Sequence, residues 1–291
     1  MSTSGYDSWL QTTEEPEYRT ARPHAEILRR LVSNTIDSAT AMKVLSLLDF
    51  KNDHTPWALW ELIYEAAADV PSSQFSLLAL LVEAEKLDSQ LPESKPKDIP
   101  RKWLGCFGSI WRDKWDMLSP HASSGWTVSA SKSTTRWINI NTFSARLLAT
   151  SSFSQGIKLR ALGLSLLNMC LEVDPTKYKE ERRQAQSALQ RQSPWYKMDV
   201  SELLAANVCA AAQWIIHAGP LMWKDDRPDS PEYIQQVLPG KTDLWDGSPG
   251  FTKGRWQLWR DRFLFMAEYE DISPDVQQVA RRAGRIMSEF L

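Results

Sequence analysis

Residues 137–149 read WININTFSARLLA, a run that places two asparagines and one arginine among apolar side chains. Alternation with the period of a strand would mix polar and apolar side chains on both faces. A helix instead aligns Asn139, Phe143 and Arg146 on one stripe and large apolar side chains on the neighbouring one. Such a helix is bulky on almost every face, which predicts that it is buried all round.

Burial sets a condition on the three polar side chains of this run. An unsatisfied buried polar group costs about 1–3 kcal/mol, and an unpaired buried charge costs more. Asn139, Asn141 and Arg146 must therefore be hydrogen-bonded or paired. Two interpretations stay open: a polar network that joins helices, or groups that face a cavity and hold a polar part of a substrate.

The rest of the chain has the same helical character. Helix-period apolar positions, capping residues and helix-ending prolines recur along it, with no credible succession of alternating strands. The expected helices lie at 22–50 (two helices), 55–70, 72–87, 103–118, 138–150, 156–173, 176–192, 199–220, 255–271 and 274–290. The sequence predicts an all-α fold, a single tryptophan-rich array of about ten helices.

Two long loops and a tail interrupt this array. Residues 119–136 are small and polar around Trp126, and residues 224–254 are rich in proline, glycine and aspartate. Loops of this length in a compact domain tend to be functional or disordered. We expect a flexible polar tail over residues 1–20 and one helical domain over residues 21–291.

Composition restricts the partners. The formal net charge is −2 and the pI is about 6.1, which offers no basic field for nucleic acid. No apolar run approaches the ~20 residues of a membrane span, and the start of the chain lacks the apolar core of a signal peptide. Three scattered cysteines make no disulfide framework. These features predict a reduced, cytoplasmic protein, with a homodimer as an alternative to a monomer.

Motifs for metals and nucleotides are missing. The four histidines have no ligand spacing, and neither CxxC nor HExxH occurs. Gly240-Lys241-Thr242 resembles part of a phosphate loop, but Gln235 stands where the first glycine belongs. We therefore expect no metal site and no cofactor.

Two residues are candidates for proton transfer. Glu65 lies in a stripe with Glu61 and Asp69, which is normally a solvated helix face. His217 lies near the expected C-terminus of an Ala-rich helix. The helix dipole favours a cation at that end. For both residues a purely structural role is the main alternative.

Fourteen tryptophans are an unusually high number for 291 residues. Each adds a large apolar area and one N–H donor that needs an acceptor. They predict either a tryptophan-rich core or an aromatic cavity, and the two can coexist. The candidate substrate-binding residues are Trp60, Trp126, Trp137, Phe143, Trp214, Trp256 and Trp259.

The order of several motifs resembles a known family. PWALWELIYEAA, WININTFSARLL, AAAQWIIHAGPLMW and LWDGSPGFTKGRWQLWRDRF follow one another, before a last helix rich in alanine and arginine. This order is similar to a fungal family catalogued only as a domain of unknown function, over roughly residues 50–290. The resemblance implies a single all-α fold and a role in fungal specialised metabolism, and it carries no catalytic residues to transfer.

Two functions are compatible with these features. The first is an enzyme without metal or nucleotide cofactor, a cyclase, isomerase or pericyclase, that binds a bulky apolar metabolite in a tryptophan-lined pocket. In this hypothesis Asn139, Asn141 and Arg146 polarise a carbonyl, and His217 or Glu65 moves a proton. The second is a non-enzymatic interaction or regulatory module whose tryptophans are core or interface anchors.

Overall fold

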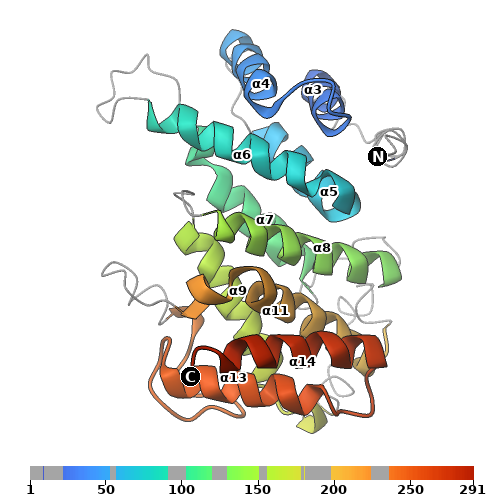
Figure 1. Cartoon of the computed structure of the whole chain (residues 1–291), viewed down its shortest axis with the longest axis vertical. Helices are drawn as coiled ribbons and strands as arrows, with labels where there is room; N and C mark the ends of the chain where they lie inside the picture. Colours follow the sequence, from blue (N-terminus) through green and yellow to red (C-terminus); the bar gives the residue numbers. More distant parts are fainter. Residues whose placement is uncertain are drawn as a thin grey trace. The chain divides into compact units, whose positions relative to one another are not determined.

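A computed structural model describes Trp9 and residues 22–52, 57–90, 103–119, 130–150, 156–177, 180, 198–223 and 236–291. These residues form helices and connecting turns (Figure 1). Within them β-pairing is limited to one isolated bridge between Lys241 and Asp246. The structure confirms the all-α, tryptophan-rich fold expected from the sequence.

The chain divides into two compact units, and the single domain expected over residues 21–291 stays a prediction. The first unit contains residues 1–115 with 150–155, and the second contains residues 116–149 with 156–291. Each unit has its own buried side chains, so each is described by itself.

The first unit contains helices and two short 3₁₀ turns. They are α3 (Arg22–Val32), α4 (Ser38–Asn52), α5 (Trp57–Asp69), η1 (Pro71–Ser73), α6 (Gln74–Ser89), η2 (Trp103–Gly105) and α7 (Phe107–Leu118), the last belonging to this unit as far as Trp115. Asp37 caps α4, because its carboxylate accepts the backbone N–H of Thr40 at 2.6 Å.

Aromatic rings form the centre of the first unit. Trp60 on α5 meets Phe107 edge to face, with ring centroids 5.7 Å apart, and Phe107 stacks on Trp111 at 4.8 Å. Tyr64 packs against Trp111 at 4.9 Å. Such pairs add about 0.5–1.5 kcal/mol each beyond the area that they bury. Trp60, Trp103, Trp111 and Trp115 are therefore core residues of this unit, whereas Trp57 is 43% exposed.

One residue of the expected tail joins this core. Trp9 is buried, and its indole N–H donates to the Asp69 carboxylate at 3.0 Å. The other residues of the segment 1–20 lie outside the described part of the chain.

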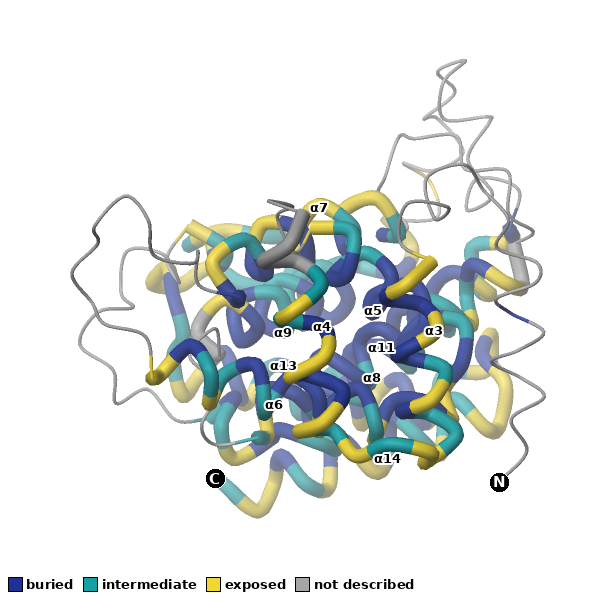
Figure 2. The backbone as a smooth tube through the Cα atoms, turned by 90° about the horizontal axis from the view of Figure 1, so that it is seen from above, coloured by how far each residue is buried: buried dark blue, intermediate teal, exposed yellow. Residues whose placement is uncertain are grey.

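The second unit is built around one long helix. Its helices are α8 (Ala130–Ala149), α9 (Gly156–Leu171), α11 (Val200–Trp223), α13 (Lys253–Met266) and α14 (Pro274–Ser288). α11 contacts the other four, and most of its residues are coloured as buried in Figure 2. Its alanines allow this, since small side chains let neighbouring helices approach closely.

Two helix boundaries differ from the sequence expectation. α8 begins at Ala130, so the second part of the expected loop 119–136 is helical. α11 continues past Pro220 to Trp223, although proline removes a backbone donor from the helix. The Met222 carbonyl in this last turn accepts a hydrogen bond from Arg160 on α9 at 3.1 Å. Packing against α9 thus stabilises a turn that local propensity disfavours.

Candidate functional site

The two asparagine positions of residues 137–149 have different surroundings, because Asn141 is fully buried and Asn139 is half-buried. The Asn141 side-chain oxygen accepts the indole N–H of Trp214 at 2.9 Å, and its amide nitrogen donates to the Trp137 carbonyl at 2.8 Å. Asn141 therefore joins α8 to α11.

A second bond of the same kind lies along the same helix pair. Trp137 donates its indole N–H to the side-chain oxygen of Asn207 on α11 at 3.2 Å. We call Trp137, Asn141, Asn207 and Trp214 the asparagine–tryptophan ladder. Each asparagine supplies the acceptor that a buried indole needs. Asn207 was not expected from the sequence. The one feature of the sequence that could have indicated it is an amide side chain within an apolar, Ala-rich helix.

The ladder is closely packed. A Cβ added at Gly163 on α9 would lie 2.6 Å from the Trp214 ring, which is closer than real Cβ contacts allow. Phe143, another predicted substrate-binding residue, is also fully buried on α8. Trp137, Phe143 and Trp214 thus lie inside the second unit and connect its helices.

We call Arg146, His217 and Arg282 the His217 corner; Arg146 and His217 are half-buried, and Arg282 is exposed. The three residues belong to α8, α11 and α14, and α11 contacts both other helices. Burial lowers the pKa of His217, and the positive charges of Arg146 and Arg282 lower it further. The pKa of the His217 imidazole therefore lies below its usual value, which favours the neutral form.

Asn139 lies on the same stripe of α8 as Arg146, seven residues before it, and both are half-buried. The structure therefore brings Arg146 and His217 together and directs Asn139 to the same side of α8. His217 lies six residues before the end of α11, not at the terminus that the sequence suggested.

The remaining acid/base candidate lies in the first unit. Glu65 is 8% exposed, and the ammonium group of Lys114 lies 3.8 Å from its carboxylate and 3.2 Å from that of Glu61. Trp60, fully buried beside it on α5, donates its indole N–H to the Trp103 carbonyl at 3.0 Å. The stripe that we expected to be solvated is thus largely covered.

Trp256 and Trp259 are fully buried on α13. The Trp256 indole N–H donates to the Met287 carbonyl of α14 at 3.1 Å. That of Trp259 donates to the carboxylate of Glu172, just after α9, at 2.7 Å. Trp256 and Trp259, both predicted to bind substrate, therefore connect α13 to other parts of the fold.

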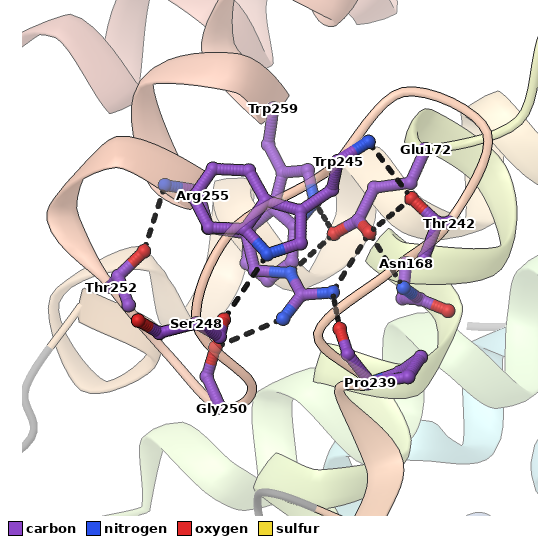
Figure 3. A network of polar contacts seen from close by, with 10 residues as sticks. All are labelled: Asn168, Glu172, Pro239, Thr242, Trp245, Ser248, Gly250, Thr252, Arg255 and Trp259. Carbon is purple, nitrogen blue, oxygen red and sulfur yellow. Dashed lines mark hydrogen bonds and ion pairs between the residues drawn. The ribbon is translucent and has the colours of Figure 1, made fainter.

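Glu172 is the centre of a buried polar cluster, the Glu172 knot (Figure 3). Arg255 donates to its two carboxylate oxygens through Nε at 2.5 Å and Nη2 at 2.8 Å. Asn168 and Thr242 donate to the second oxygen at 2.8 and 3.0 Å. The side chains of Glu172 and Arg255 are 0% exposed. The ion pair is thus buried with five donors on one carboxylate.

The knot also shapes the loop before α13. Arg255 donates to the carbonyls of Pro239 at 2.8 Å and Gly250 at 3.0 Å, and the Trp245 ring lies 5.3 Å from its guanidinium carbon. Gly250 has a φ of 85°, which favours glycine. Residues 236–252, expected as loop, are therefore fixed to the end of α9.

Arg255 thus contacts both an aromatic ring and a carboxylate. Glu172 was not expected, because nothing in the sequence distinguishes it from an ordinary helix-terminal glutamate. Trp126 lies outside the described residues, as do 120–129 and 224–235. Among the residues that are described, no group of three histidine, cysteine, aspartate or glutamate side chains is placed to hold a metal ion.

The fold and these clusters define an all-α, tryptophan-rich protein with polar groups at its helix junctions. The chain belongs to the family described as "Protein of unknown function (DUF3632)", whose profile matches residues 60–263. No curated protein and no solved structure matches the chain. In the described part of the chain, every helix is too short or too polar to cross a membrane.

Proposed function

We propose that this protein is a small-molecule enzyme that moves a proton without a metal or nucleotide cofactor, an isomerase or cyclase acting on a largely apolar metabolite. The observation that supports this is the His217 corner, where a half-buried imidazole lies with Arg146 and Arg282. The setting in fungal specialised metabolism and in the cytoplasm belongs to the same proposal.

The chemistry follows from the charges. A neutral imidazole can accept a proton from carbon next to a carbonyl group. The electrons then move to the carbonyl oxygen, and an adjacent guanidinium group stabilises the negative charge that develops there. The imidazolium returns the proton at another position, which completes an isomerisation. Asn139, on the same stripe as Arg146, supplies a further donor to orient the carbonyl.

In this proposal the ladder has a supporting role. Asn141, Trp137 and Trp214 set the register between α8 and α11, so that Arg146 and His217 lie at the same level. A misplacement of a catalytic group by about 1 Å can cost 10²-fold in rate. Glu65 and Trp60 belong to the first unit, and the proposed reaction does not use them.

Native mass spectrometry after incubation with a lipophilic metabolite extract from the source organism tests the proposal. We expect the unmodified protein to retain a small molecule and to convert it to an isomer of unchanged mass. His217→Asn should retain the ligand but lose conversion, and Arg146→Gln should lose both. Arg285→Gln is the matched control, because Arg285 is exposed one turn beyond Arg282 on α14. Failure to bind, or equal conversion by all variants, contradicts the proposal.

A second candidate function is a non-enzymatic interaction module, which exposed apolar side chains in the first unit favour. Phe75 on α6 is 70% exposed, and Leu47 on α4 is 54% exposed with Val44 one turn before it. A second copy of the chain is the partner that we propose for this surface. Sedimentation equilibrium should then show a dimer that Phe75→Glu or Leu47→Glu dissociates, whereas a monomeric unmodified protein contradicts this candidate.

A further inference from the structure

Arg262 on α13 differs from Arg255, which lies two helical turns before it. Arg255 presents Nε and Nη2 to a carboxylate, the side-on geometry that makes two parallel hydrogen bonds. Arg262 has the same two nitrogens buried, and within the described structure neither finds an acceptor. We call this Nε and Nη2 edge of a guanidinium group a fork. The fork of Arg255 is filled by a carboxylate, whereas that of Arg262 is empty.

An empty fork is costly at this depth. A buried donor without an acceptor loses its hydrogen bonds to water and gains none in return, and the penalty is larger when it carries charge. Burial accordingly lowers the pKa of Arg262 below its usual value. Buried polar groups in native proteins are nearly always paired with protein, water or a ligand. The Arg262 fork is therefore a place where an anionic ligand would gain strong hydrogen bonds.

The surroundings of Arg262 leave the fork for an external acceptor. Cys170, Asp174 and Tyr269 interact electrostatically with Arg262, but none of these groups accepts a hydrogen bond from its Nε or Nη2. Asp174 already accepts the backbone N–H of Thr176 at 2.8 Å, and the Tyr269 hydroxyl is hydrogen-bonded to Asp271 at 3.0 Å. Burial raises the pKa of the Cys170 thiol to about 12, so it is uncharged at neutral pH.

The fork of Arg262 lies close to the protein surface. The Arg262 side chain is half-buried, and its guanidinium carbon lies 4.5 Å from the centre of the Phe265 ring. Phe265 is itself 46% exposed, so this ring lies at the surface beside the guanidinium. The same ring offers an apolar contact to the body of a ligand.

We propose that the Nε and Nη2 edge of Arg262 binds the carboxylate of a small organic monoacid, as the equivalent edge of Arg255 binds Glu172. A carboxylate matches the fork with two oxygens. The negative charge of Asp174 nearby favours a singly charged ligand over a phosphate dianion. The site lies on α13 and involves none of the residues of the His217 corner, so it is independent of the proposed reaction.

Calorimetric titration of the whole chain with benzoate tests this site, with benzamide as the neutral analogue of the same shape and inorganic phosphate as the dianion. We expect saturable binding of benzoate alone. Arg262→Lys keeps the charge but loses the fork, and it should weaken benzoate binding at least tenfold. Arg260→Lys is the matched control on the same helix, since Arg260 pairs with its exposed neighbour Asp261. It should bind benzoate as the unmodified protein does, and so should His217→Asn.

Unchanged benzoate binding by Arg262→Lys, equal binding of benzamide, or a preference for phosphate overturns the proposal. A second measurement uses the unmodified protein, so it does not depend on whether a variant folds. In the unmodified protein with ¹⁵N-labelled arginine, benzoate should shift one arginine Nε–Hε resonance and leave the others in place. If none shifts, the fork holds only water and the proposal is wrong.

Discussion

The Glu172 knot and the His217 corner both place guanidinium groups at helix junctions of the second unit, yet they differ in burial and in charge balance. In the knot one carboxylate faces one guanidinium, both fully buried, and further donors complete the shell. In the corner the charges of Arg146 and Arg282 act on the half-buried imidazole of His217, and Arg282 is exposed. The knot thus balances opposite charges in the interior, whereas the corner brings charges of one sign around a titratable base near the surface.

The largest effect should come from removing the carboxylate of the knot. Glu172→Gln leaves the Arg255 charge buried with an acceptor of half the capacity, and we expect a loss of about 3–5 kcal/mol in the free energy of unfolding. Urea denaturation followed by circular dichroism measures it. The double variant Glu172→Met with Arg255→Met should lose less, because no unpaired charge remains. A double variant as unstable as the single one would contradict this account of the knot.

A smaller loss is expected where the ladder touches α9. Gly163→Ala would bring a methyl group against the Trp214 ring, and overpacking of this kind costs about 1–3 kcal/mol. Gly219→Ala on α11 is the matched control, because its Cβ would meet the nearest side-chain atom at 3.4 Å. Gly219 precedes Pro220, whose ring disfavours a Cβ on the preceding helical residue, so Gly219→Ala should cost some stability but less than Gly163→Ala. Equal effects of the two changes would show that the contact with Trp214 does not limit packing.

Asn141 gives a comparable test of the ladder's hydrogen bonds. Asn141→Ala leaves the Trp214 indole N–H without its acceptor and should cost about 1–3 kcal/mol. Thr142→Ala, next in sequence, removes only a hydroxyl that bonds the Ile138 carbonyl within α8, and should change stability by less than about 0.5 kcal/mol. Thermal denaturation of the two variants compares them directly. If Asn141→Ala proves as mild as Thr142→Ala, the ladder does not contribute to stability.

The smallest effect on stability should come from the corner, where the change appears as a pH dependence. The folded-state pKa of His217 is lowered, so the unfolded chain binds its proton first as the pH falls. The His217 contribution to stability should therefore be constant above the unfolded pKa, about 6.5, and decrease as the pH falls from there to the folded pKa. His217→Asn should remove this component.

Arg282→Gln tests the cause of that dependence. Without the Arg282 charge the pKa of His217 should rise, which proton NMR of the histidine ring protons measures. The free energy of unfolding at neutral pH should change by less than about 0.5 kcal/mol, because Arg282 is exposed. An unchanged titration would separate His217 from Arg282 and remove one cation from the proposed site.

The sequence predicted the helices better than their ends. Helical periodicity was readable, because it depends on residues close together in the chain. The extension of α8 back to Ala130 and of α11 past Pro220 was not readable. In α11 the extra turn contacts Arg160, which is distant in sequence.

For the candidate sites the same division holds. Types of residue and their spacing identified Asn141, Arg146, His217 and Arg255 as polar groups that needed partners. Asn207 and Glu172 were missed, because their role depends on the hydrogen-bond donors that contact them, and these donors are distant in the sequence. The empty fork of Arg262 could not be foreseen either, since Arg255 and Arg262 look alike in the sequence.

By itself, then, the sequence determined that this protein is helical and rich in buried tryptophan, because apolar period and capping are local properties of the chain. It also determined that buried amide and guanidinium groups would have to find partners, because desolvation makes isolated ones costly. Only the tertiary structure decided which partners these are. Hydrogen bonds such as those from Arg255 to Glu172 and from Trp214 to Asn141 join residues more than seventy positions apart, and their geometry exists only once the helices have packed.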